Sequence, residues 1–266
     1  MSAVVSSLLS SSGLAARVWR GTDLGHAGAP VLHSGWARLD AELPGGGWPC
    51  GALTELLVPR AALLEWRLLG TALRAALRPG GLLVLVGPPA VPYLPGLRDQ
   101  GIDPAQLVWV RSRDAGQSLW AAEQVLRAGG AAAVLAWLPS CRAEALRRLQ
   151  AHAQEGRAPV FALRPEQARA EASPAPLRVH ARPGEPWELR VQVLKRRGPA
   201  HEQELRLASR PAGLAQAMVE TPGSCAGIAA SRGWGAEALE DPVGETHRVP
   251  GEHGDAMGRI AGLRLA

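Results

Sequence analysis

The sequence has a single lysine among its 29 basic residues; all the others are arginines. A conventional phosphate-binding loop, GxxxxGK[ST], needs a lysine directly after a glycine, because the ammonium group reaches the β- and γ-phosphates. The one lysine, Lys195, stands instead in the stretch "VLKRRG". The composition therefore excludes a conventional ATP or GTP site.

Cysteines and long apolar runs are also scarce. Cys50, Cys141 and Cys225 lie far apart with no CxxC pair, so neither a zinc site nor a disulfide framework is indicated. No apolar run reaches the length of about 18 residues that a membrane helix needs. Serines interrupt the N-terminal stretch "MSAVVSSLLSSSGLAA", which lacks the basic start of a secretion signal. We therefore expect a cytoplasmic protein with no membrane span.

The sequence does contain a series of strand-sized apolar runs separated by segments with helical spacing. The runs are nearly continuous in apolar character, as in strands that are buried on both faces of a sheet. They cover residues 51–58, 81–87, 107–111, 131–138 and 159–165. The helical segments cover 60–78, the stretch from a cap at Ser112 or Asp114 to Arg127, and the stretch from a cap at Ser140 to about Gln154. This alternation predicts an α/β fold with a mostly parallel sheet flanked by helices.

The apolar pattern changes toward the C-terminus. Trp187, Leu189, Val191 and Val193 alternate with polar residues, which predicts a half-exposed strand. Residues 202–208 can return beside it. We therefore expect the sheet to end in an antiparallel extension.

The domain organisation follows from composition and charge. We expect an N-terminal helix or linker over 1–30, a core over 31–210 and a disordered tail over 211–266, because the tail is rich in glycine and acidic residues and lacks periodicity. Residues 1–210 hold 25 Lys+Arg against 17 Asp+Glu, whereas the tail holds 4 against 7. The basic body suits a polyanionic partner such as nucleic acid, or is a solvated basic surface.

The segment between the first predicted strand and the first predicted helix stands where a phosphate-binding loop would. Val58 and Leu63 occupy the two glycine positions, Leu64 the lysine position and Glu65 the hydroxyl position. Neither "GPPAVP", which follows the second predicted strand, nor "AWLPS", which ends the fourth, offers a carboxylate to orient water or bind Mg²⁺. We therefore predict no ATPase activity, no cofactor and no metal site.

Two long stretches resemble RecA-type recombinases. "HSGWARLDAELPGGGWPCGALTEL" is similar to the segment that precedes the phosphate loop in those proteins, and "LRVHARPGEPWELRVQVLKRRGP" to their late strands and the basic turn near the subunit interface. Within that superfamily, "VWRG", "LPGGGWPxGALTELL" and "VLKRRGP" resemble the ImuA family, over about residues 17–208.

The resemblance to ImuA implies a degenerate RecA-like fold and a non-catalytic accessory role in SOS-induced, error-prone translesion synthesis after DNA damage. The implied partners are ImuB, which is a Y-family polymerase homologue, and an error-prone DNA polymerase III alpha-type subunit, with RecA and DNA as further partners. RecA proteins have a mobile DNA-binding loop after each of the fourth and fifth core strands. Here the first gap holds a helix and the second is short, so neither gap matches a RecA DNA-binding loop.

Two other functions fit parts of the sequence. A division inhibitor resembling SulA, which binds FtsZ, shares the degenerate RecA-like fold, although such chains are typically shorter. A DNA-dependent ATPase with an unconventional site would need the carboxylates that the sequence lacks.

The candidate partner-binding residues are Lys195, Arg196 and Arg197, which follow a predicted strand. The resemblance implies that they contact DNA or a neighbouring RecA-like subunit. Without the resemblance, the three basic residues fit a solvated turn as well as they fit a binding site.

Two further groups of residues have more ordinary interpretations. The arginines of the third predicted helix, Arg142, Arg147 and Arg148, are typical of a solvated face. Trp36 and Trp48 flank the glycine run and are predicted to be core or staple residues, although an exposed tryptophan here would be a candidate interface anchor.

Overall fold

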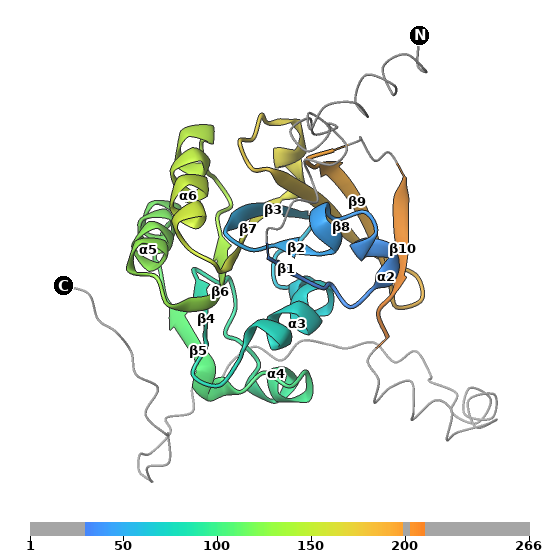
Figure 1. The fold of residues 1–266 in the computed structure, drawn as a ribbon, viewed down its shortest axis with the longest axis horizontal. Helices are drawn as coiled ribbons and strands as arrows, with labels where there is room; N and C mark the ends of the chain where they lie inside the picture. The colour runs from blue at the N-terminus through green and yellow to red at the C-terminus, as the bar shows by residue number, and fades with distance from the viewer. Residues whose placement is uncertain (1–29, 199–202, 211–266) are drawn as a thin grey trace, which may run out of the picture. The chain divides into compact units, whose positions relative to one another are not determined.

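The computed structural model describes residues 30–198 and 203–210 of the 266-residue chain. They form an α/β fold around an eight-stranded mixed sheet (Figure 1). The predicted α/β class, with a mostly parallel sheet and an antiparallel C-terminal extension, is confirmed. The predicted tail, and all but the last residue of the predicted N-terminal linker, lie outside the described residues.

The large sheet has the strand order β10-β9-β8-β3-β7-β6-β4-β5. Strand β3 is central and pairs in parallel with both β7 and β8, while β6, β4 and β5 continue the parallel part. Strands β9 and β10 add the antiparallel edge. The bounds are β3 (Ala52–Val58), β4 (Leu82–Val86), β5 (Leu107–Val110), β6 (Ala131–Trp137), β7 (Pro159–Pro165), β8 (Leu177–Gly184), β9 (Glu188–Lys195) and β10 (Glu204–Ala208).

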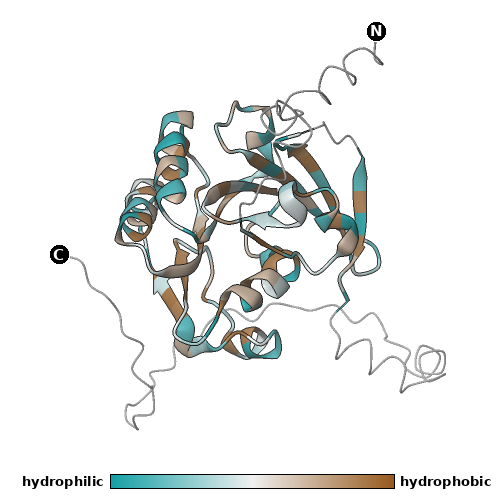
Figure 2. Ribbon diagram, in the orientation of Figure 1, coloured by the Kyte–Doolittle hydropathy of each residue, from teal (hydrophilic) through white to brown (hydrophobic). Residues whose placement is uncertain are grey.

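Helices cover both faces of this sheet. One face packs against α2 (Ala37–Asp40), α3 (Glu65–Ala76) and α4 (Leu94–Asp99), and the other against α5 (Ala115–Ala128) and α6 (Ala143–Glu155). Within the described residues, three short 3-10 helices lie in the connections: η2 (Pro44–Gly46), η3 (Pro104–Gln106) and η4 (Glu166–Ala170). Figure 2 shows the hydrophobic colouring along the central strands and hydrophilic colouring on α6.

Of the helix caps predicted on the second face, the one at α5 is confirmed and the one at α6 is wrong. Asp114 caps α5 as expected, because its carboxylate accepts the backbone N–H of Gln117 at 2.9 Å. Ser140 is not the cap of α6. That helix follows Arg142, which has no capping side-chain bond.

The apolar pattern alone does not predict β8, because Arg178 and His180 interrupt it. Both side chains are nevertheless buried, since each meets an acidic partner. Trp187, predicted as the first residue of the next strand, lies instead in the turn before β9 with a φ of 61°.

The glycine run of the resemblance has a packing explanation. A small second sheet pairs β1 (Val31–Leu32) with β2 (Trp48–Pro49), and a Cβ atom on Gly47 would lie 2.5 Å from the carbonyl oxygen of Leu32. The run also places Trp48 in the core, fully buried with its ring 5.6 Å from that of Phe161. Trp48 is therefore a core residue, as predicted.

Candidate functional site

The connection between β3 and α3 occupies the position of a phosphate-binding loop. Strand β3 ends at Val58, and α3 begins at Glu65, five residues later than the sequence pattern predicts. Leu64, in the lysine position, is 1% exposed and packs into the core below α3. The loop thus presents an apolar side chain inward where a nucleotide-binding loop would present an ammonium group outward to phosphate.

The carboxylate of Glu65 is bound by the loop itself. One oxygen, Oε1, accepts the backbone N–H of Ala62 at 2.6 Å, and Oε2 accepts the backbone N–H of Leu64 at 3.0 Å. The indole N–H of Trp137, at the end of β6, donates to Oε1 at 3.2 Å. Glu65 is fully buried, so an internal anion receives the loop N–H groups that a helix N-terminus otherwise offers to a bound phosphate.

This arrangement requires an unusual backbone at Ala62, which has a φ of 60°. A left-handed conformation costs a residue with a Cβ atom about 1–2 kcal/mol. The bond from the Ala62 N–H to a charged acceptor offsets that cost, since bonds to charged groups contribute about 1.5–3 kcal/mol. The Glu65 carboxylate therefore stabilises the loop shape.

The predicted basic turn is placed at the end of β9, and two of its three side chains bind the protein. The Lys195 ammonium donates to the carbonyl of Ser173 at 2.8 Å. Arg196 pairs with the Glu42 carboxylate at 2.8 Å and is only 15% exposed. Arg197 is exposed. Arg196 thus joins the basic turn to Glu42, the residue just before "LPGGGW". The binding of a partner by this turn stays a prediction.

The arginines of α6 lie apart from this turn. Arg148 pairs with Glu123 of α5 at 2.9 Å, while Arg142 and Arg147 are exposed. A solvated face remains the simplest interpretation of these three side chains.

Sequence reasoning missed a buried charge network in the middle of the sheet. Glu55 of β3 is fully buried and pairs with Arg164 of β7 at 2.7 Å and with Arg178 of β8 at 2.6 Å. The one signal in the sequence is a single charged residue, Glu55, within the strand-sized run "ALTELLV". Burial alone would lower the pKa of Arg164, but its bonds to Glu171 and Glu55 outweigh that effect and raise it.

The same network fixes the connection between β7 and β8. Arg164 also donates to the Cys141 carbonyl at 3.1 Å and to the Glu171 carboxylate at 2.8 Å. Arg178 donates to the carbonyl of Ala168, in η4, at 2.8 Å. Together with the Lys195 bond to Ser173, these contacts hold the short connection against the sheet.

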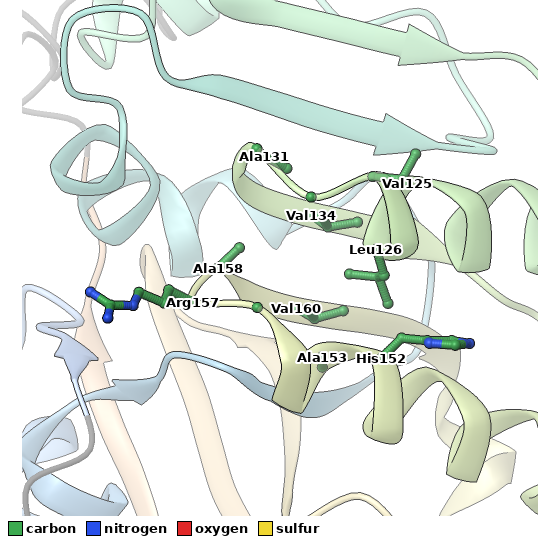
Figure 3. Close-up of a pocket in the computed structure, with 12 residues that line it drawn as sticks. Val125, Leu126, Ala131, Val134, His152, Ala153, Arg157, Ala158 and Val160 are labelled. Atoms are coloured by element: carbon green, nitrogen blue, oxygen red, sulfur yellow. The ribbon is translucent and has the colours of Figure 1, made fainter.

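A small pocket lies between the ends of α5 and α6 and the starts of β6 and β7. Figure 3 shows Leu126 and Val160 facing the pocket, whereas the guanidinium of Arg157 points away from it. Its volume is about 40 Å³, against about 300–1,000 Å³ for typical ligand pockets. The pocket holds no more than a few atoms.

Residues 30–198 and 203–210 hold no cluster of three or more His, Cys, Asp or Glu side chains arranged to bind a metal ion. None of the helices in those ranges has the length and apolar character needed to cross a bilayer.

Comparison with known proteins gives two kinds of relative. The chain is 33% identical over 126 residues to Protein ImuA from Caulobacter vibrioides, in strains NA1000 / CB15N and ATCC 19089 / CIP 103742 / CB 15 alike, which is 46% of this chain and 52% of each relative. It is 35% identical over 81 residues to Cell division inhibitor SulA from Edwardsiella piscicida, which is 30% of this chain and 48% of that protein.

These matches cover parts of the proteins. The chain spans about half the length of each of these relatives. No family model matches it. The chain is thus similar to ImuA and SulA proteins over part of its length.

Proposed function

We propose that this protein is a non-catalytic, RecA-like accessory protein that acts in SOS-induced, error-prone translesion DNA synthesis, as the ImuA resemblance implies. The observation that supports the absence of nucleotide chemistry most strongly is the Glu65 carboxylate, which accepts the backbone N–H groups of Ala62 and Leu64. A phosphate at this loop would compete with a covalently attached anion and meet its negative charge at close range.

The proposed mechanism is that of an adaptor. A sheet flanked by helices keeps its outer surfaces when its nucleotide loop closes, and these surfaces remain able to bind proteins. We propose an ImuB-like Y-family polymerase homologue and an error-prone polymerase subunit as partners, with RecA and DNA as further candidates. The exposed Arg197 at the end of β9 is the residue of the basic turn that is best placed to contribute.

A second candidate function is supported by the similarity to the division inhibitor SulA, at 35% identity over 81 residues. In that case the partner would be FtsZ, and production of the protein would stop septation. The shorter extent of this match, 30% of the chain against 46% for ImuA, favours the first proposal.

Affinity capture from DNA-damaged cells separates the two functions. An epitope-tagged full-length chain at its own locus should co-purify with translesion polymerase proteins, and its deletion should lower the damage-induced mutation frequency without changing cell length. Capture of FtsZ, together with filamentous cells on overproduction, would instead establish the division inhibitor. An undiminished mutation frequency in the deletion strain would overturn the proposed accessory role.

A further inference from the structure

The turn between β8 and β9 carries a tryptophan whose position the fold alone does not explain. Trp187 is 43% exposed, and its φ of 61° lies in the left-handed region that residues with a Cβ atom rarely adopt. Glycine would satisfy this backbone without strain and would expose no large apolar surface. Trp187 therefore has a strained backbone and an exposed indole at a position where the turn itself does not require a tryptophan.

Arg67 of α3 and Ser209 hold this indole in place. The guanidinium carbon of Arg67 lies 5.7 Å from the centre of the Trp187 ring. Its Nη2 group donates to the Glu188 carbonyl at 3.3 Å and to the Ser209 hydroxyl. Ser209 donates its backbone N–H at 2.9 Å and its hydroxyl at 2.7 Å to the Trp187 carbonyl. These contacts hold the exposed indole in one orientation, so less side-chain entropy is lost when a partner binds it.

The charge of Arg67 has no acidic partner. Among the described residues no carboxylate lies within ion-pair distance of it, and its buried Nε–H group has no acceptor. Burial lowers the pKa of Arg67, because partial removal from water disfavours the charged form. A partly buried cation with an unused donor is costly unless a binding partner supplies an anion.

We propose that Arg67 and Trp187 are the anchor of a protein-docking surface, whose partner presents a carboxylate to Arg67 and an apolar or aromatic side chain to the exposed indole. Tryptophan and arginine are among the residues most enriched where protein interfaces concentrate their binding energy. Glu185 and Glu188, near Trp187 in the chain, would repel the many phosphates of a nucleic acid more strongly than the single carboxylate of a protein side chain, which favours a protein partner. This surface is distinct from the Glu65 loop and does not depend on the function proposed above.

Peptide selection on the full-length chain tests this proposal without a named partner. A phage library of random peptides is selected on the immobilised chain and depleted on the Trp187→Gly variant. The enriched peptides should combine Asp or Glu with aromatic or large apolar residues. A synthetic peptide of the enriched sequence should lose at least about tenfold in affinity for Trp187→Gly and for Arg67→Gln.

Controls keep structural and binding effects apart. Trp187→Gly should keep the melting temperature of the parent chain, since glycine suits the turn, and Arg67→Gln is a second variant if it does not. Trp120→Ala, which removes another half-exposed tryptophan, 50% exposed on α5, should bind the peptide with unchanged affinity. Absence of Trp187-dependent peptides, enrichment of basic peptides, or Trp187-dependent binding of an oligothymidylate would each overturn the proposal, the last by making this a nucleic-acid surface.

Discussion

At the scale of single residues, Glu65 sets the properties of the loop after β3. Its carboxylate receives three N–H groups while fully buried, so each donor depends on it. An amide at this position would keep one acceptor oxygen and place an NH₂ group against other donors.

We therefore expect Glu65→Gln to lower the free energy of unfolding by about 2 kcal/mol, because bonds from backbone donors to a charged acceptor are lost in a buried site. Urea denaturation monitored by circular dichroism provides the measurement. Glu144→Gln, in the exposed first turn of α6, is the matched control and should change stability by about 0.5 kcal/mol or less. Equal losses in the two variants would show that the Glu65 bonds contribute little.

The left-handed backbone at Ala62 gives a second residue-scale prediction. Ala62→Gly removes a backbone strain of about 1–2 kcal/mol and so stabilises the folded state. The glycine also gives the unfolded chain more freedom, which destabilises the fold by about 0.4–1 kcal/mol. At Ala61, where φ is not positive, only the second effect operates. Ala62→Gly should therefore melt at a higher temperature than Ala61→Gly in a calorimetric scan, and the reverse order would exclude strain at Ala62.

Several of these residue details were beyond prediction from the sequence. The substitutions at the glycine and lysine positions are visible in the sequence, as is Glu65 in the hydroxyl position. That its side chain turns inward onto Ala62 and Leu64 depends on the left-handed Ala62 and on Trp137, which comes from a strand some seventy residues later. Sequence patterns do not encode such contacts.

At the scale of elements, ion pairs attach loops to strands. Arg196 fixes the end of β9 to the segment after α2, whereas Arg197 extends into solvent. Replacing all three residues of the basic turn at once would therefore change both the stability of the fold and the binding of a partner.

Arg196→Ala should cost about 1–2 kcal/mol in unfolding free energy, because the partly buried ion pair between Arg196 and Glu42 is lost. Arg197→Ala should cost about 0.5 kcal/mol or less and instead weaken any binding of DNA, lowering the salt slope by about 0.7–0.9 for a lost phosphate contact. Chemical denaturation and fluorescence anisotropy at several salt concentrations measure the two effects. Unchanged DNA affinity and salt slope in Arg197→Ala would remove the turn from the candidate DNA contacts.

The Glu55 network makes the corresponding prediction inside the sheet. Glu55→Gln leaves the guanidinium groups of Arg164 and Arg178 buried without their shared anion, so a loss of about 3–5 kcal/mol is expected. Glu171→Gln removes a carboxylate that is 56% exposed and should cost about 1 kcal/mol or less. Thermal melts of the two variants provide the comparison, and losses of equal size would contradict a dominant central pair.

At the scale of the whole molecule, apolar runs that alternate with helical segments were enough to predict the fold class and the parallel strands β3 to β7. Strand β8 escaped the apolar pattern because Arg178 and His180 are buried through acidic partners from distant segments. The glycine run suggested a nucleotide-binding frame, and the structure shows that Gly47 serves close packing against β1. Local sequence patterns do not show which polar residues pair across long distances in the chain, and so they miss strands that depend on such pairs.

The central claim is that this α/β fold works without nucleotide, and titration calorimetry with ATP and Mg²⁺ tests it most directly. The full-length chain should release no saturable heat of binding and should show no turnover with single-stranded DNA, because Glu65 occupies the loop N–H groups. A RecA protein titrated with ATP under the same conditions is the positive control, because its binding shows that the calorimeter would detect binding by this chain. Saturable micromolar binding of ATP by this chain would contradict the account.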